Sequence, residues 1–157
     1  PANPFTGKPA PLRAHTNEKD DNGAFWCFSQ NGAFFKFYPA EDRTELIGTN
    51  WGETDYITNM CFSPKKRYIY YMSRSAGCPI IQYDTITDSK KVIAFLYDFY
   101  VEKYGYGHGK FYGIELDREG KSLFFFSNGG FVEKGGEVTY KRPSMVHLHI
   151  PESERME

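Results

Sequence analysis

The sequence predicts an all-β protein built from a recurring four-stranded unit, and three observations support this prediction. Aromatic residues make up 18% of the 157 residues, and aromatic side chains favour the pleated, half-buried surfaces of β-sheets. From Gly23 onward, short apolar and aromatic runs alternate with turn residues about every 8 to 12 positions, which is typical of all-β chains. The third observation is an internal repeat of a two-stranded pattern.

The first residues of the chain differ from the rest. Residues 1–22 are rich in Pro, Asn, Asp and charge, so we expect an extended arm or linker there. The predicted strands follow in order: Ala24–Ser29, Ala33–Tyr38, Thr44–Gly48, Ile57–Phe62, Tyr68–Ser73, Pro79–Asp84, Lys91–Leu96, Tyr112–Asp117, Ser122–Ser127 and Met145–Ile150. The best helical candidate, Tyr97–Tyr104, is short and rich in strand-forming residues, and we assign it to a loop over residues 97–110.

The repeat places Ile57–Ser73 over Phe111–Ser127. Both copies consist of a strand, a polar turn, a basic residue and an aromatic strand that ends in Ser, and Ala24–Ser29 matches the second of these strands. A third strand follows in every copy: Phe35–Tyr38, Ile81–Asp84 and Val146–His149. A four-stranded unit that recurs about every 40 to 55 residues is typical of β-propeller blades.

Residues 62–96 (FSPKKRYIYYMS…IIQYDTITDSKKVIAFL) resemble a blade of the bacterial WD40-like and lactonase-like β-propellers. In that family a Ser-Pro turn joins the first two strands, and a Tyr-Asp or Trp-Asp pair, here Tyr83-Asp84, ends the third. The resemblance covers roughly residues 23–151 and is strongest over 57–96. True WD40 repeats carry Gly-His before the first strand, which this chain lacks, so no WD40-type signalling partner is implied.

The strand count predicts three blades, at about residues 23–50, 51–98 and 108–151. Arg13–Asp20 is too polar to predict a first strand for the first blade, and the last blade has no fourth strand. We therefore expect an incomplete ring, which is either the C-terminal part of a six- to eight-bladed propeller or a piece that another chain completes. We favour the first reading, because isolated blades would expose apolar faces and an unpaired edge.

The net charge and the distribution of apolar residues limit the classes of function that are possible. The net charge of −1 removes the electrostatic basis for non-specific binding of nucleic acid. No apolar run is long enough to span a membrane, and Pro1-Ala2-Asn3-Pro4 lacks the features of a signal peptide. Because position 1 is not Met, we expect a processed or truncated start, and an extracellular or periplasmic location is favoured over a cytoplasmic one.

The three cysteines are Cys27, Cys61 and Cys78. Their wide spacing forms neither CxxC nor CxxCH, which argues against a zinc ribbon and against c-type haem attachment. We expect buried thiols rather than a disulfide with one free thiol.

The candidate catalytic residues are His108 and Tyr106, within the glycine-rich part of the loop 97–110. Loops that connect one blade to the next usually carry the ligand sites of propellers, and a neutral imidazole binds metal or transfers protons. The repeat places Glu53 close to the position of His108, so Glu53, Asp55 and His108 are the candidate ligands of a divalent metal ion. The favoured alternative is that the glycines only form turns and that His108 is solvated.

Other polar residues carry weaker signals. His147 and His149 share one face of a strand, where packing or surface exposure is favoured over metal binding. Glu115 and Asp117 lie on a strand nearer the channel, but Asp117 is better explained as the cap of the following turn. The basic segment 128–143 is expected to be a long solvated connection rather than a partner-binding hairpin.

Two classes of function remain. The first is a non-catalytic binding or assembly module that binds a protein, glycan or small-molecule ligand. The alternative is half of a propeller enzyme, such as a lactonase-like hydrolase or a polysaccharide lyase, with a metal or acid/base site at the channel mouth. A third possibility is a subunit whose unfinished blade edge pairs with a partner strand.

Overall fold

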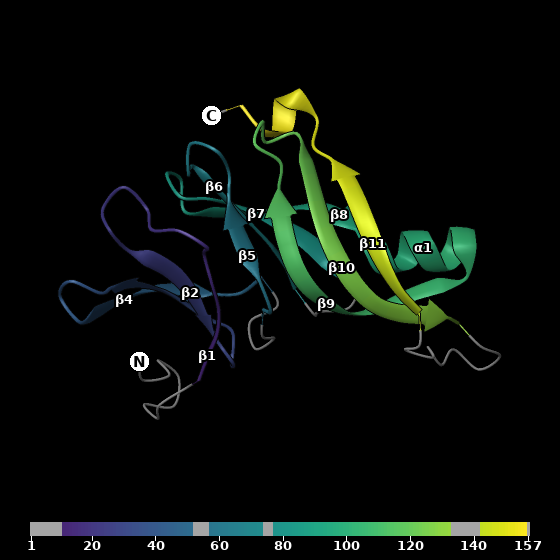
Figure 1. The fold of residues 1–157 in the computed structure, drawn as a ribbon, viewed down its shortest axis with the longest axis horizontal. Helices are drawn as coiled ribbons and strands as arrows, with labels where there is room; N and C mark the ends of the chain where they lie inside the picture. The colour runs from purple at the N-terminus through teal and green to yellow at the C-terminus, as the bar shows by residue number, and fades with distance from the viewer. Residues whose placement is uncertain (1–10, 52–56, 74–76, 133–141, 157) are drawn as a thin grey trace.

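The computed structural model describes residues 11–51, 57–73, 77–132 and 142–156. Three antiparallel sheets follow one another along the chain (Figure 1). Sheet 1 contains β1 (Leu12–His15), β2 (Phe25–Ser29), β3 (Ala33–Tyr38) and β4 (Arg43–Thr49). Sheet 2 contains β5 (Met60–Phe62), β6 (Tyr68–Met72), β7 (Pro79–Asp84) and β8 (Ser89–Phe95). Sheet 3 contains β9 (Tyr106–Leu116), β10 (Ser122–Phe131) and β11 (Arg142–His149).

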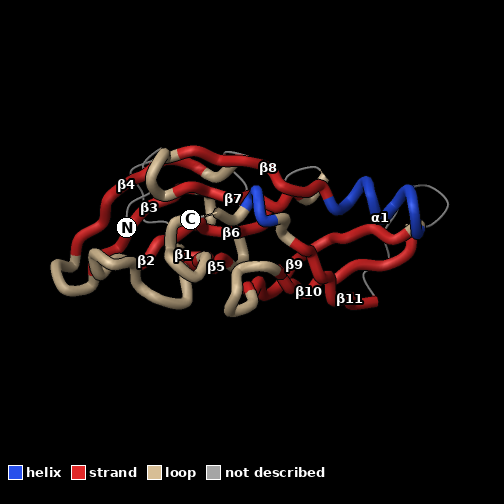
Figure 2. The backbone as a smooth tube through the Cα atoms, turned by 90° about the horizontal axis from the view of Figure 1, so that it is seen from above, coloured by secondary structure: helices blue, strands red, loops and turns tan. Residues whose placement is uncertain are grey.

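Each sheet is a meander in which every strand pairs with the next one in the chain. The first strands of the sheets lie nearest to one another, since β5 contacts both β1 and β9 (Figure 2). This is the arrangement of propeller blades around an axis, and the ring is not closed. The prediction of an incomplete ring with three blades is therefore confirmed, and within the described residues sheet 3 has no fourth strand.

Two hydrophobic cores hold the sheets together, one in each space between neighbouring sheets. The core between sheets 1 and 2 contains Trp26, Phe28 and Phe34 together with Tyr71 and Ile81. The core between sheets 2 and 3 contains side chains from alternate positions of the same strands of sheet 2, and its members include Tyr70, Met72, Ile80, Phe125 and Val146. Because successive side chains of a strand point to opposite faces, β6 is buried on both sides.

The structure adds a strand that the sequence analysis left in the arm. Leu12–His15 pairs with β2 and completes sheet 1, although only Ala14 of this strand is buried. One side chain of the strand is buried and three are exposed, so its sequence lacks the apolar pattern of the other strands. Backbone pairing with β2, rather than side-chain burial, places it in the sheet.

A helix replaces most of the predicted loop 97–110. The helix α1 (Leu96–Tyr104) ends at Gly105, whose φ of 60° is the left-handed conformation that glycine adopts without strain. Its Phe, Tyr and Val residues have low helix propensity, and the helix is stabilised by burial of Leu96 in the core between sheets 2 and 3. The strand β9 then begins at Tyr106, so the glycine-rich segment is strand rather than loop.

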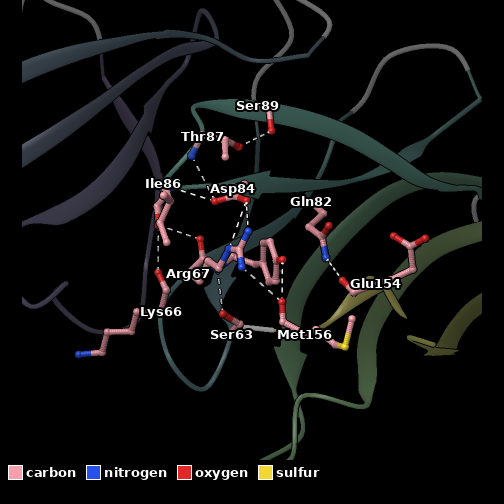
Figure 3. A network of polar contacts seen from close by, with 12 residues as sticks. Ser63, Lys66, Arg67, Gln82, Asp84, Ile86, Thr87, Ser89, Glu154 and Met156 are labelled. Atoms are coloured by element: carbon pink, nitrogen blue, oxygen red, sulfur yellow. Dashed lines mark hydrogen bonds and ion pairs between the residues drawn. The ribbon is translucent and has the colours of Figure 1, made fainter. Parts of the chain in front are cut away.

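Hydrogen bonds hold the C-terminal segment, which includes Glu154 and Met156, against sheet 2 (Figure 3). The Tyr68 hydroxyl donates a hydrogen bond of 3.0 Å to the Met156 carbonyl, and the Gln82 side-chain amide donates one of 2.5 Å to the Glu154 carbonyl. On the same sheet, the Arg67 guanidinium lies 2.9 Å from the Asp84 carboxylate. Burial acts to raise the pKa of Asp84, but the bonds from Arg67 and two backbone amides outweigh it and lower the pKa.

Two further predictions can be compared with the fold. The three cysteines are free and buried, as expected. No helix in the described part of the chain is long and apolar enough to cross a membrane.

Candidate functional site

His108 lies on β9 and its side chain is 2% exposed. Its Nδ1 is 2.8 Å from the Ser127 hydroxyl oxygen on β10. The ring stacks on Phe111 at 5.3 Å and meets Tyr100 of α1 edge-on at 4.6 Å. Burial lowers the pKa of His108 to about 4, so the imidazole is neutral at neutral pH. The prediction of a solvated loop residue is wrong, because the bond to Ser127 and the aromatic rings hold His108 in the core.

Tyr106 lies beside His108, with ring centroids 5.0 Å apart. Its hydroxyl donates a hydrogen bond of 2.5 Å to the Arg142 carbonyl of β11. A Cβ atom at Gly129 would lie 2.3 Å from the Gly107 carbonyl oxygen and 2.7 Å from the Tyr106 hydroxyl. The two predicted catalytic residues are therefore neighbours, but they are packed within sheet 3 and its contact with α1.

The predicted metal site is only partly covered by the structure. Glu53 and Asp55 lie outside the described residues, so their distance from His108 is not defined. Among the residues that the structure describes, no three His, Cys, Asp or Glu side chains are grouped so as to hold a metal ion. The metal site formed by Glu53, Asp55 and His108 stays a prediction.

A different feature recurs in all three sheets. We call the side of a sheet that is turned toward the next sheet in the chain its forward face, defined on sheets 1, 2 and 3 by Phe28, Met72 and Phe126. On this face an aromatic residue of the second strand meets a polar residue of the third strand. The Lys36 ammonium lies 4.4 Å from the centre of the Trp26 ring in sheet 1, and Gln82 donates a 2.9 Å hydrogen bond to the Tyr70 hydroxyl in sheet 2. In sheet 3 the equivalent pair lies at the end of the array, where its aromatic residue is half-buried and its polar residue is exposed.

The pair in sheet 3 consists of Phe124 and His147, whose rings stack at 4.8 Å with an interplanar angle of 8°. Beside it, Phe126 pairs with Met145, in the register by which Met72 pairs with Ile80 in sheet 2. Met72 is 6% exposed and Ile80 is fully buried, whereas Phe126 is 57% and Met145 is 62% exposed. The forward face of sheet 3 thus repeats the apolar positions of an internal interface without being covered.

The opposite side of sheet 1, its rear face, is the other end of the array. On the rear face Cys27 pairs with Phe35, as Tyr71 pairs with Ile81 and Phe125 with Val146 in the two sheets that follow. Cys27 and Phe35 help to line a hollow of about 430 Å³, together with Leu12, Phe37, Asp42 and Thr44. Burial raises the pKa of the Cys27 thiol to about 12, so the thiol is protonated and poorly reactive at neutral pH.

His147 and His149 are exposed on β11, as expected. The Asp117 carboxylate accepts a hydrogen bond of 2.7 Å from the Lys121 amide, which confirms its role in the turn. Glu115 lies on β9 opposite Phe124. Of segment 128–143, residues to Phe131 extend β10 and those from Arg142 begin β11, while 133–141 lie outside the described residues.

The uncovered forward face is not among the sequence predictions, although the repeat contains a signal for it. Phe124 and Phe126 align with Tyr70 and Met72, and the alignment alone indicates that both pairs serve the same interface. The roles of His108 and of the glycines around it depend instead on neighbours that are distant in the sequence.

No family model and no curated protein sequence matches the chain. Several solved structures are similar to it in fold. A protein of unknown function from Bacteroides thetaiotaomicron is 12% identical with a TM-score of 0.59, over 94% of this chain and 35% of that one. An oligogalacturonate lyase from Vibrio parahaemolyticus is 13% identical with a TM-score of 0.53, over 80% and 34%. A putative TolB from Agrobacterium tumefaciens is 14% identical with a TM-score of 0.50, over 76% and 38%.

These similarities place the chain among proteins with a β-propeller fold. At this level of identity they show the fold alone. The chain spans about a third of the length of each of these three structures.

Proposed function

We propose that this chain is a propeller segment that serves as a non-catalytic binding or assembly module and completes a ring with another propeller segment or chain. The observation that supports the proposal is the recurrence of one interface. Phe126 and Met145 take the positions on sheet 3 that Met72 and Ile80 take on sheet 2, where these two residues are buried against the next sheet.

The energetic argument favours a covered face. Full burial of a Phe or Met side chain stabilises a structure by about 1.5–3 kcal/mol relative to exposure. Phe126, Met145 and Tyr112, which is 53% exposed, lie together because Phe126 pairs with both of the others. Contiguous exposed apolar residues of this kind mark interaction sites.

The enzyme alternative receives less support. A lactonase-like hydrolase or polysaccharide lyase needs its acid, base or metal to reach a substrate. His108 is buried among aromatic rings, and the Tyr106 hydroxyl is bonded to a backbone carbonyl. A catalytic role for these residues, and a glycan or small-molecule ligand, stay predictions.

The four methionines provide an internal test of the proposal. Met145 is 62% and Met156 65% exposed, whereas Met60 and Met72 are 3% and 6% exposed. Hydrogen peroxide converts accessible methionine to the sulfoxide, and mass spectrometry reads the extent at each position. In the native assembly, purified from the cells that make it, we expect Met156 to oxidise quickly and Met145 to be protected like Met60 and Met72.

Equal oxidation of Met145 and Met156 in the native assembly would contradict the proposal, because the forward face of sheet 3 would then be free. Unfolding the same sample in urea is the control. All four methionines should then react at similar rates, which shows that protection comes from structure.

A further inference from the structure

We infer that a hollow between sheets 1 and 2 binds a short acidic peptide segment. The hollow has a volume of about 260 Å³ and lies where the turns of the two sheets meet. We call it the basic hollow, because one aromatic and four cationic residues contribute to its lining: Trp26, Lys36, Lys65, Lys66 and Arg67. It is separate from the forward face of sheet 3, so this site goes beyond the proposed function.

The next junction along the chain holds a peptide segment at its turn end. Between sheets 2 and 3, the Gln82 side-chain amide donates its hydrogen bond of 2.5 Å to the Glu154 carbonyl (Figure 3). The Tyr68 hydroxyl donates to the Met156 carbonyl at 3.0 Å. A junction between two sheets can therefore bind a short segment through the carbonyl groups of its backbone.

The internal repeat makes the basic hollow equivalent to that place. Trp26 pairs with Lys36 on sheet 1 in the register by which Tyr70 pairs with Gln82 on sheet 2. Trp26 and Lys36 line the basic hollow, whereas Tyr70 lines a smaller hollow of about 180 Å³ beside the C-terminal segment. The two hollows thus occupy the same position at successive junctions.

The two hollows differ in charge. The repeat that places Ile57–Ser73 over Phe111–Ser127 sets Lys65 on Glu119 and Lys66 on Gly120, and these turn residues line their respective hollows. The basic hollow concentrates cations in a chain whose net charge is −1. Because charge-assisted hydrogen bonds from ammonium and guanidinium groups favour carboxylates, the segment that fits this hollow is acidic.

The backbone at Lys66 supports a role for its side chain. Its φ of 61° lies in the left-handed region, which is strained for a residue with a Cβ atom. Gly120 has a φ of 71° at the equivalent position, where glycine adopts it without strain. The Lys66 ammonium lies 3.4 Å from the Glu18 carboxylate and 3.5 Å from that of Asp21. The turn therefore holds a lysine where glycine would fit better, and this lysine already contacts carboxylates.

The acidic residues near the hollow leave it able to bind a further carboxylate. The side chains of Glu18 and Asp21 are 55% and 85% exposed, and exposed ion pairs of this kind contribute little. An incoming carboxylate can replace them at Lys66. The Asp20 carboxylate has a different role, since it accepts hydrogen bonds from two backbone amides of its own turn and from the Trp26 indole at 2.9 Å.

A synthetic peptide with the sequence of residues 151–156, Pro-Glu-Ser-Glu-Arg-Met, is the probe. Fluorescence anisotropy of the labelled peptide, titrated with the purified chain, gives the affinity. The control peptide has Gln in place of both Glu residues, and we expect it to bind at least ~10-fold more weakly, because it lacks the charge-assisted hydrogen bonds. The affinity of the acidic peptide should also fall as salt is added.

Variants of the chain locate the site. We expect Lys36→Gln and Lys66→Gly each to weaken peptide binding by at least ~10-fold. Glycine suits the backbone at position 66, so the second variant removes the ammonium without straining the turn. Lys121→Gln is the matched control, because it removes a cation from the turn of sheet 3 and should leave the affinity unchanged. Far-UV circular dichroism confirms that each variant is folded.

Nuclear magnetic resonance separates the basic hollow from the place of the C-terminal segment. The peptide should shift the indole N–H signal of Trp26 and leave that of Trp51, which is not part of the lining. The variant Trp51→Phe assigns the two signals.

Equal affinity of the wild type, Lys36→Gln and Lys66→Gly would overturn the inference, and so would a lack of peptide binding. Inorganic phosphate is the competing probe. If phosphate shifts the Trp26 signal and the peptide does not, the hollow binds a small anion and the peptide inference is wrong. None of these outcomes changes the protection of Met145, so they are distinguishable from failure of the proposed function.

Discussion

His108 shows how neighbours in space decide the role of a residue. In the sequence it stands between glycines, which indicates an accessible loop. In the fold, Phe111 and Tyr100 enclose the ring and the Ser127 hydroxyl lies 2.8 Å from Nδ1. A histidine that is buried in this way makes the stability of the fold depend on pH, because the folded state favours the neutral imidazole over the charged one.

We expect the stability of the chain to fall as the pH drops from about 6.5 toward 4. The pKa of His108 is about 4 when folded against an ordinary value of 6.5, so below pH 6.5 the unfolded chain binds a proton that the folded chain does not. We therefore expect the free energy of unfolding to be lower at pH 5 than at pH 7 by about 2 kcal/mol on account of His108. Urea titrations at the two pH values measure this difference.

The variant His108→Gln supplies the reference for this measurement, because other groups titrate in the same range. The difference between the two pH values should be smaller in the variant by about the same 2 kcal/mol. Identical pH dependence in variant and wild type would show that His108 is not held neutral by the fold.

At the scale of the elements, the pairing of β9 with β10 is irregular. The register of this pair shifts twice, once at Gly113, whose φ is 79°. Such bulges change which residues face the core, so simple alternation along Tyr106–Leu116 does not predict that His108, Phe111 and Ile114 are all buried. Between the two strands Gly129 leaves room for the Gly107 carbonyl.

Gly129→Ala should destabilise the chain by about 2 kcal/mol or more, because a Cβ atom 2.3 Å from the Gly107 carbonyl oxygen forces the strands apart. Gly48→Ala is the matched control in another strand, since nothing lies within 4 Å of a Cβ atom there. We expect it to change stability by no more than ~0.5 kcal/mol. Similar effects of the two substitutions in thermal or urea unfolding would show that this close approach is relaxed in solution.

The sequence predicted the elements that carry their own apolar signal. Strands such as Tyr68–Met72 were found because they are buried on both faces and bounded by turns. Leu12–His15 was missed because three of its four side chains are exposed. The helix Leu96–Tyr104 was missed because its residues favour strands and its stability comes from packing and from the cap at Gly105. The burial of His108 depends on contacts with another strand and a helix, which no local pattern contains.

At the scale of the whole molecule, the two cores make each sheet depend on its neighbours. Sheet 2 is buried on both sides, whereas the forward face of sheet 3 is exposed at Phe126 and Met145. Sheet 3 therefore gains most from a partner that covers this face. Folding and association become linked, since a partner that binds only the folded chain stabilises it by mass action.

The aromatic–polar pair that recurs on the forward face of all three sheets shows what this position in a blade requires. Trp26 with Lys36, Tyr70 with Gln82 and Phe124 with His147 occupy equivalent registers but use three different chemistries. The interface between sheets thus requires a large ring beside a polar group at this register, and it leaves the identity of both residues free.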